Sequence, residues 1–518
     1  ECVMSNLSDL IPAGGGQNNT DFVADGTIVS GKGVILTAAG KAAPIAETPV
    51  AAALYDLETI ASGTQYYGDW CYDTVNDKLV LIFSNSAYSS YPAYTIGTVT
   101  TNAVSWTTPT IIFSRAIGYL GCCYNATEDR IAMACQDSSL PKAIVGTSDG
   151  STITWGSVVT ITNPAGYTPT WANNNLVEWP GTSKVVWCGV EGNLNYQGYA
   201  CTATLSGSGA SATSTWGTAA TFTTAGISNR PIYVDMCYDQ GVGDQVIITY
   251  GKGSTNVEAS AAAISGTTMT FGTAVAAISA AMGQYANALA YDTDNNKALM
   301  VYGAGATSGN ATISYSRVIS TTGSVITLGT QADFIGVVGG SPSQYAYGFL
   351  RALTYSSHSS NFVFMYLNTT EEDGFVTTVS ISGTTNTWSD NQTEYNDNEV
   401  PDGNMFPLYD PDTDQAVLCY RDKGTSQYLV SQVYTIPYGA TNLTSTNLLG
   451  VASAAIADTE TGTINTWGSR NEVQTGLTIA SNYYVQGDGT ITTTSTSPAQ
   501  LIGTAISATQ INIKDYTG

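Results

Sequence analysis

The chain contains one histidine, His358, in 518 residues, and only 11% of its residues are charged. A single histidine excludes histidine-rich zinc sites and nearly excludes a triad in which histidine activates a serine or cysteine nucleophile. Apolar runs near twenty residues are also missing, so the sequence predicts no membrane-spanning helix. The start of the chain lacks a basic segment followed by an apolar one, so we expect no secretion signal.

Basic residues are scarce: 16 Lys and Arg stand against 40 Asp and Glu, which gives a formal net charge of −24. Such a surface repels phosphate backbones and anionic membranes, so nucleic-acid binding and membrane insertion are both disfavoured. Because charges are few, solubility depends on Thr, Ser, Asn, Gly and Tyr. This composition is typical of rigid extracellular or particle-bound β proteins.

Nine cysteines are present, but their placement argues against a disulfide framework. Cys71, Cys123 and Cys237 each stand just before a repeated tyrosine, and we expect equivalent positions of different repeats to lie too far apart to be bridged. The sequence therefore predicts small, buried, reduced thiols and folding in a reducing cytosol. The question of pairing stays open only for Cys122 with Cys123 and for Cys201.

A sequence repeat of about fifty to sixty residues occurs seven times along the chain. In each copy an apolar run is followed by a short polar turn and a second apolar run, and in four copies the first run ends in a tyrosine–aspartate pair. The repeated tyrosines are Tyr72, Tyr124, Tyr238, Tyr291, Tyr355 and Tyr409, and a degenerate copy occupies 171–187. A second marker follows the pair of runs in six copies. It is a large residue, most often Trp, and in four copies a glycine comes next, as in Trp155-Gly156. Each copy thus holds about four short strands with turns between them.

Four strands per repeat, repeated radially, are the pattern of a β-propeller. The seventh copy lacks the Trp-Gly strand, whereas residues 50–61, ahead of the first copy, align with the final-strand region that precedes Tyr291. We therefore predict an all-β fold with a seven-bladed β-propeller over residues 48–440, whose last blade is completed by residues 50–61. This closure removes the unpaired edges of an open ring. A β-sandwich array or a β-solenoid of similar hairpins is the alternative.

The flanking segments, 1–47 and 441–518, hold short alternating strands separated by Gly-Asp-Gly and Ser-Pro turns, which predict a small β-barrel or sandwich. Their motifs are Met4–Pro12, Phe22-Val23-Ala24-Asp25-Gly26 and Tyr483–Thr490. These motifs resemble virion and tail-associated structural proteins of tailed bacteriophages. The resemblance implies that both segments belong to one β domain and that the propeller is inserted between its halves. The motifs are structural, so the resemblance implies no catalytic residues.

Acidic turns are the candidate metal sites. Asp292–Asn296 and Asp410–Asp414 place oxygen ligands at alternate positions, as hard cations such as calcium prefer. The equivalent turns at 73–77 and 125–129 carry weaker ligand sets. Asp and Asn also favour tight turns for conformational reasons alone. We favour the acidic turn and keep calcium as the alternative.

A glycosidase that uses two carboxylates is the main enzymatic alternative, because Asp and Glu are plentiful. Ser148–Trp155 is similar to the turn motif of sialidases, but such an enzyme needs three arginines around its substrate carboxylate. Arginines are few here and include Arg115, Arg230 and Arg351. We therefore interpret the motif as a hairpin turn.

Tyrosine is abundant, with 32 residues, and it is the candidate for binding. The clusters are Tyr88, Tyr91 and Tyr94, and Tyr345 with Tyr347. Exposed aromatic rings beside Asn and Ser stack on sugars and bind their hydroxyls. The alternative is that these tyrosines pack the blades, and that is our interpretation of the repeated Tyr-Asp position.

The sequence as a whole predicts a non-enzymatic phage virion protein, tail-associated or displayed on the capsid, that presents its propeller for attachment to the host surface. No catalytic, cofactor-binding or metal-binding residue is nominated, and no cofactor is expected. The expected partners are other virion subunits, further copies of the chain in a homo-oligomer, and a host-surface glycan or receptor. We expect folding in the host cytoplasm and a final location on the virion. The alternatives are a capsid decoration protein without a receptor role and a propeller-type glycan-active enzyme.

Overall fold

The chain is all-β in the part that the computed structural model describes, which is residues 18–137, 140–161, 175–190, 197–223, 231–252, 256–278, 282–304, 313–334, 345–347, 352–368, 373–396, 405–424, 427–444, 446–493 and 499–514. Two short 3-10 turns are its helical elements, η2 (Ser86–Tyr88) and η3 (Gly209–Ser211). No helix in these ranges has the length and apolar character to cross a membrane. The chain divides into two compact units, residues 52–436 and residues 1–51 with 437–518.

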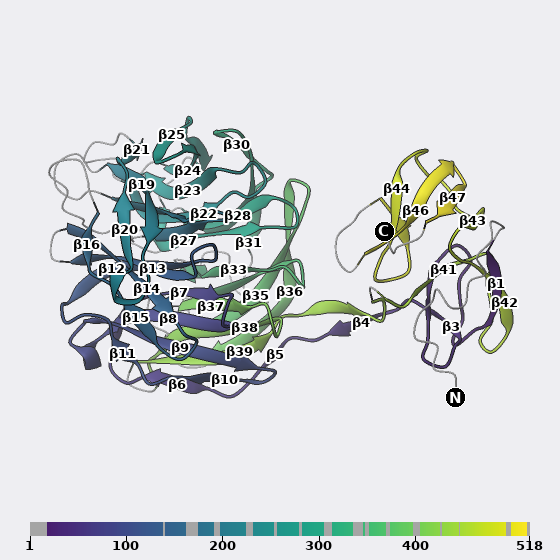
Figure 1. Cartoon of the computed structure of the whole chain (residues 1–518), viewed down its shortest axis with the longest axis horizontal. Helices are drawn as coiled ribbons and strands as arrows, with labels where there is room; N and C mark the ends of the chain where they lie inside the picture. Colours follow the sequence, from purple (N-terminus) through teal and green to yellow (C-terminus); the bar gives the residue numbers. More distant parts are fainter. Residues whose placement is uncertain are drawn as a thin grey trace. The chain divides into compact units, whose positions relative to one another are not determined.

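Residues 52–436 contain, in their described part, seven five-stranded antiparallel sheets (Figure 1). The first sheet comprises β7 (Gln65–Asp73), β8 (Lys78–Asn85), β9 (Pro92–Thr100), β10 (Ala103–Trp106) and β11 (Thr110–Ile111). The second comprises β12 (Ile117–Asn125), β13 (Arg130–Asp137), β14 (Leu140–Ser148), β15 (Ile153–Trp155) and β16 (Val159–Thr160). The third comprises β17 (Asn175–Trp179), β18 (Lys184–Val190), β19 (Gly198–Ser206), β20 (Thr213–Trp216) and β21 (Ala220–Thr223).

The later sheets repeat this plan. The fourth comprises β22 (Pro231–Tyr238), β23 (Gln245–Lys252), β24 (Asn256–Ser265), β25 (Thr268–Phe271) and β26 (Val275–Ile278). The fifth comprises β27 (Met282–Asp292), β28 (Lys297–Ala304), β29 (Ile313–Thr322), β30 (Val325–Leu328) and β31 (Ala332–Phe334). The sixth comprises β32 (Tyr345–Tyr347), β33 (Leu353–Ser356), β34 (Asn361–Asn368), β35 (Gly374–Ser382) and β36 (Thr385–Asn396). The seventh comprises β37 (Met405–Asp410), β38 (Gln415–Asp422), β39 (Tyr428–Thr435), β5 (Ala53–Leu54) and β6 (Glu58–Ala61).

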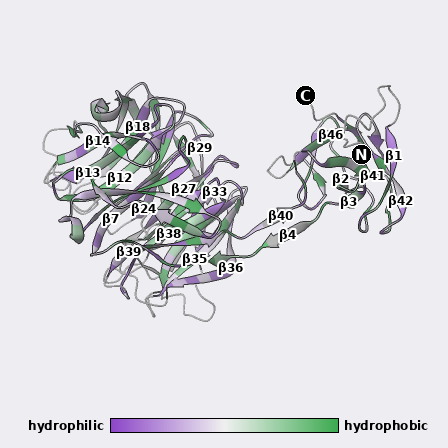
Figure 2. Ribbon diagram, turned by 60° about the horizontal axis from the view of Figure 1, so that its bottom comes forward, coloured by the Kyte–Doolittle hydropathy of each residue, from purple (hydrophilic) through white to green (hydrophobic). Residues whose placement is uncertain are grey.

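The core lies between neighbouring sheets. The second strand of each sheet is an almost continuous apolar run, as in β8, where Leu79 to Phe83 are all buried. A strand that is covered on both faces reads as such a run rather than as an alternation, and these runs are green in Figure 2. Burial of each large apolar side chain stabilises the fold by about 1.5–3 kcal/mol. Because the clusters join successive sheets, no single sheet holds a core of its own.

The sheets follow one another in a closed circuit. The first strands contact each other in the order β7, β12, β17, β22, β27, β33 and β37, and β37 contacts β7 again. One apolar cluster contains Phe406 and Leu408 of the seventh sheet together with Leu81 and Phe83 of the first. The strand missing from the seventh repeat is supplied from ahead of the first, since β5 and β6 both pair with β39 (Figure 1). The predicted pairing of residues 50–61 with the last repeat is therefore confirmed for these two strands.

Where the second marker of the repeat carries a glycine, neighbouring sheets approach closely. A Cβ atom added at Gly272 would lie 2.0 Å from the carbonyl oxygen of Ser324, which belongs to the next sheet. The same contact would occur at 2.0 Å between Gly329 and the Thr384 carbonyl. Main-chain atoms cannot yield as a flexible side chain can. This steric demand explains why these two markers carry glycine.

Gly272→Ala is therefore expected to lower the free energy of unfolding by about 1–3 kcal/mol, the usual cost of forcing extra atoms into a packed interface. Gly118→Ala is the matched control, because the nearest atom to its added Cβ is the flexible Gln136 side chain at 3.6 Å. Urea unfolding of the two variants measures both effects. Equal losses would show that the close approach between sheets has no special cost.

The second unit is built from both chain ends. One sheet has the order β1 (Asn19–Val23), β42 (Thr461–Asn465), β41 (Leu448–Ala452), β2 (Gly33–Leu36) and β3 (Ala42–Pro44). The other has the order β43 (Arg470–Asn471), β47 (Gln510–Ile513), β46 (Gln500–Ser507), β44 (Asn482–Val485) and β45 (Ile491–Thr492). A two-stranded ribbon, β4 (Glu47–Val50) with β40 (Tyr438–Thr441), also belongs to this unit. Residues 52–436 are thus an insertion between the two segments that build it.

Candidate functional site

Acidic residues shape several of the hairpins that follow the repeated tyrosines. Asp292 accepts hydrogen bonds from the backbone N–H groups of Asp294 and Asn295, both at 2.9 Å, and Asp73 does the same for Val75 and Asn76. The last turn residue adopts a positive φ, as at Asp77, Asp129, Asp244, Asn296, Ser360 and Asp414. Asp and Asn tolerate this left-handed conformation better than most residues. The carboxylates therefore have a conformational role.

No group of three or more His, Cys, Asp or Glu side chains in the described ranges is arranged to hold a metal ion. The first carboxylate of each of the two richest turns binds within its own hairpin instead. Asp410 accepts from the Thr413 hydroxyl at 2.7 Å, and the Asn295 amide donates to Asp292 at 2.8 Å. The calcium alternative therefore receives no support from these turns.

Tyrosine hydroxyls connect the hairpins of neighbouring sheets. Tyr291 donates to Asp239 of the preceding sheet at 2.7 Å, and Tyr355 donates to Asp294 at 2.7 Å. Tyr409 donates to Asp414 of its own hairpin at 3.0 Å. Each of these three tyrosine side chains is half-buried. Tyr291 and Tyr355 therefore tie their hairpins to the preceding ones while part of each side chain stays accessible.

Burial and carboxylate neighbours shift the ionisation of these groups. Burial, followed by the hydrogen bond to the acidic partner, raises the pKa of Tyr291 and of Tyr355 far above the usual tyrosine value. Burial also raises the pKa of Tyr409. The hydroxyls therefore stay protonated at every physiological pH, so they serve as fixed hydrogen-bond donors and not as general bases.

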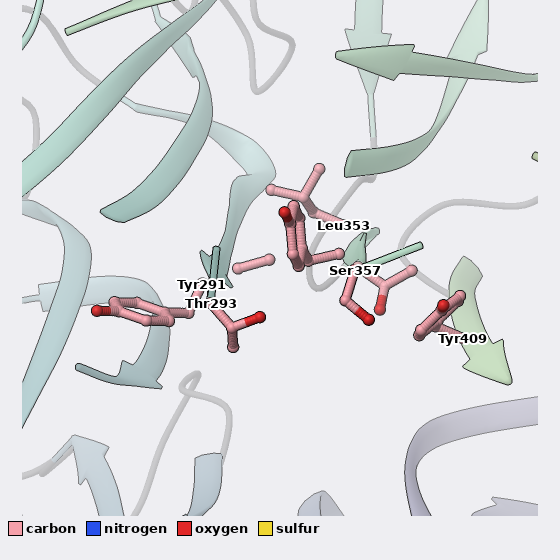
Figure 3. Close-up of a pocket in the computed structure, with 8 residues that line it drawn as sticks. Tyr291, Thr293, Leu353, Ser357 and Tyr409 are labelled. Atoms are coloured by element: carbon pink, nitrogen blue, oxygen red, sulfur yellow. The ribbon is translucent and has the colours of Figure 1, made fainter. Parts of the chain in front are cut away.

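In the following, the inner strand of a sheet is its first strand, the one that contacts the first strands of the neighbouring sheets. One pocket lies where the inner strands of the fifth, sixth and seventh sheets, β27, β33 and β37, lead into their hairpins (Figure 3). Its volume is about 330 Å³, and it is lined by Ala290, Tyr291, Thr293, Leu353, Thr354, Tyr355, Ser357 and Tyr409. Figure 3 shows Thr293 and Ser357 between Tyr291 on one side and Tyr409 on the other. The lining offers aromatic faces and hydroxyls but no carboxylate, imidazole, amine or thiol. The side chains of this lining therefore supply no general acid or base.

The stability of the protein is expected to depend on pH through Asp410, which follows the pocket residue Tyr409. Burial raises its pKa above the usual aspartate value, which means that the folded chain binds this proton more tightly than the unfolded chain. Stability from this group is therefore present below the unfolded pKa of about 3.9 and is lost as pH rises through the higher folded pKa. Asp410→Asn should stabilise the protein at pH 7, and this gain should vanish below about pH 4. Thermal unfolding of both proteins across this range tests it, and a pH-independent difference would contradict it.

The tyrosine clusters predicted from the sequence have different surroundings. Tyr94 is buried, and its hydroxyl accepts a hydrogen bond from the Ile153 N–H at 3.0 Å, so it packs two sheets together. Tyr88 packs with its ring against Phe83. The side chains of Tyr345 and Tyr347 lie outside the described residues. The tyrosines that line the pocket belong instead to the repeated Tyr-Asp position, for which the sequence predicts blade packing alone.

The sialidase-like turn is a hairpin in the second sheet. Asp149 accepts hydrogen bonds from the backbone N–H groups of Ser151 and Thr152, at 2.8 and 2.7 Å, and these bonds lower its pKa. The Arg115 guanidinium forms an ion pair with buried Asp137. Arg230 and Arg351 lie outside the described residues. His358 lies in the sixth hairpin with its Nδ1 3.1 Å from an Asp414 carboxylate oxygen.

The eight described cysteines are all free and buried, which confirms the prediction of buried, reduced thiols for these eight. Burial raises the pKa of Cys201 and Cys419, and a buried thiol of this kind is a poor nucleophile. One neighbour was not anticipated. The Cys122 thiol lies beside Cys71 of the preceding sheet. Burial is the main cause that raises the pKa of Cys122, and the neighbouring Cys71 raises it further. These two cysteines are not equivalent positions of the repeat, so the argument from spacing did not cover them.

Comparison with known proteins gives a fold likeness only. No family model matches the chain, and no curated protein matches it. Among solved structures, the BP39L lectin from Burkholderia pseudomallei shares 10% identity over 74% of this chain and 99% of its own, with a TM-score of 0.49. The Cps50 (Swd1) β-propeller domain shares 9% identity over 74% of this chain and 100% of its own, with a TM-score of 0.44. The GH93 α-L-arabinofuranosidase of Fusarium graminearum shares 10% identity over 61% of this chain and 92% of its own, with a TM-score of 0.38. Similarity at this level carries no argument about ligand or activity.

Proposed function

We propose that the chain is a non-enzymatic virion protein of a tailed bacteriophage that attaches the particle to the host surface. In this proposal the seven sheets form one closed seven-bladed β-propeller, inserted in a small β-barrel or sandwich domain. The circuit of contacts from β7 round to β37 and back to β7 supports the closed ring. The pairing of β5 and β6 with β39 supports the closure of the last blade.

The observation that carries a binding role is the chemistry of the pocket at the inner-strand ends. Its lining presents three tyrosines and two exposed hydroxyl residues, Thr293 and Ser357. A glycosidase needs two carboxylic acids that face each other across the substrate. The lining of this pocket contains neither an Asp nor a Glu. Binding without turnover is the function that fits such a surface.

The virion role is supported by the resemblance of the terminal segments and by the insertion itself. Residues 1–51 and 437–518 form one unit, and residues 52–436, which carry the pocket, are inserted between these two segments. In our proposal the terminal unit contacts other virion subunits, in several copies, and the inserted unit contacts the host. A capsid decoration protein would share the terminal unit but lack the receptor role.

Competition for adsorption tests this function. Purified full-length protein, added to host cells before the phage that encodes it, should occupy the receptor and reduce the adsorption rate in a concentration-dependent manner. An unrelated propeller protein of similar net charge is the control. Unchanged adsorption at saturating protein would contradict the attachment role and would favour a decoration protein.

A further inference from the structure

We propose that the pocket between the fifth, sixth and seventh sheets binds one uncharged sugar ring of a host-surface glycan. This inference rests on the proposed attachment function and names the ligand class of its site. The pocket volume of about 330 Å³ lies at the lower end of the range for small-molecule sites, about 300–1,000 Å³. It is therefore suited to a single pyranose or to the end of a longer glycan.

The aromatic side chains are held in place before any ligand arrives. Tyr291 donates its hydroxyl proton to Asp239 at 2.7 Å and accepts a hydrogen bond from the Gly241 N–H at 2.7 Å. Tyr355 donates to Asp294 at 2.7 Å. A ring fixed at its hydroxyl end loses little conformational entropy when a ligand packs against it. The apolar C–H face of a sugar is the ligand surface that such a ring binds.

The polar groups of the pocket match a polyhydroxy ligand. Thr293 and Ser357 occupy the same hairpin position in consecutive sheets, two residues after the repeated tyrosine, and both are exposed. A hydroxyl group both donates and accepts hydrogen bonds, so it pairs with sugar hydroxyls in either sense. Figure 3 shows both side chains between Tyr291 and Tyr409, where a ligand in the pocket would meet them. Leu353 adds an apolar wall.

The charge around the pocket selects against anions. The fifth and seventh hairpins that border the lining carry Asp292, Asp294, Asp410, Asp412 and Asp414, and the whole chain has a net charge of −24. A negative field of this kind repels sialic acids and phosphorylated sugars. None of these five carboxylates is among the residues that line the pocket, so they do not create a cation site in the lining. The negative charge around the pocket and the absence of charged groups from its lining both favour an uncharged sugar.

The test uses full-length protein and the methyl glycosides of glucose, galactose, mannose and N-acetylglucosamine, with sialic acid as the anionic probe. Saturation-transfer NMR should show contact with at least one neutral glycoside and none with sialic acid. Ser357→Tyr fills the pocket from an exposed hairpin position, and it should weaken binding at least 10-fold. Ala126→Tyr adds the same side chain at the equivalent position of the second hairpin and should leave binding unchanged.

Unfolding must occur at the same temperature in both variants and the wild type. If Ser357→Tyr is less stable, Thr293→Tyr, which fills the same pocket from the fifth sheet, replaces it. The inference is overturned if no neutral glycoside binds, if the filled pocket binds as well as the wild type, or if Ala126→Tyr is equally impaired. Loss of this inference alone would leave competition for adsorption intact, whereas failure of the attachment function would abolish that competition.

Discussion

Ile60→Asp is expected to lower the free energy of unfolding of residues 52–436 by about 3–5 kcal/mol, because a buried aliphatic side chain is lost and a charge without a partner takes its place. Ile60 is 6% exposed and belongs to the apolar cluster that joins the seventh and first sheets. It lies in β6, which reaches the seventh sheet from ahead of the first repeat. A charge at this position therefore weakens the strand that closes the circuit.

Thr59→Asp is the control for this substitution, because Thr59 is exposed in the same strand and pairs with Val430. Urea unfolding gives the two stabilities. Hydrogen exchange of the β39 amides should accelerate in Ile60→Asp and not in Thr59→Asp, since β6 pairs with β39. Similar stabilities for the two variants would show that the closing strand adds little to the fold.

Asp235→Ala should cost about 3 kcal/mol, because it removes the acceptor of several buried donors at once. Asp235 is 3% exposed. Its carboxylate accepts hydrogen bonds from the Leu289 N–H of the next sheet at 2.8 Å and from the Asn175 side chain of the preceding sheet. One carboxylate thus connects three consecutive inner strands, and its loss leaves donors in a dry interface.

Asp235→Asn provides the graded comparison, because its amide retains one acceptor oxygen of the two. We expect a loss smaller than that of Asp235→Ala, measured by urea unfolding of both variants. Asp69 offers a second instance, since it accepts from the Cys122 N–H of the next sheet at 2.6 Å. A loss below about 1 kcal/mol for Asp235→Ala would mean that the interface rearranges to supply other acceptors.

The strands could be predicted from the sequence because their signals are local. Apolar runs such as Leu79–Phe83 and the turns between them mark β8 and its neighbours, and the gap in the seventh repeat indicated the role of residues 50–61. The splitting of most final strands was not anticipated, as with β10 and β11, which both pair with β9. At the break between β25 and β26, Gly272 lies close to Ser324 of the next sheet, a contact between residues far apart in the sequence.

The pocket could not be predicted for a related reason. Tyr355 and Asp294 are 61 residues apart, and the sequence alone does not show that they meet across two sheets. The repeated tyrosine therefore indicated packing and gave no sign of an accessible ring. Thr293 and Ser357 look like ordinary turn residues until the two hairpins are placed side by side. The Gly272 contact with Ser324 is likewise a property of the assembled circuit.

In our proposal the chain belongs to the particle of a tailed phage, and electron cryomicroscopy of such intact particles tests this central claim most directly. The account predicts density for the chain on the particle surface, with residues 1–51 and 437–518 against other virion subunits. The hairpin ends around Thr293 and Ser357 should face outward and stay accessible. Particles that lack the chain, or that bury those hairpins against neighbouring subunits, would contradict an attachment function.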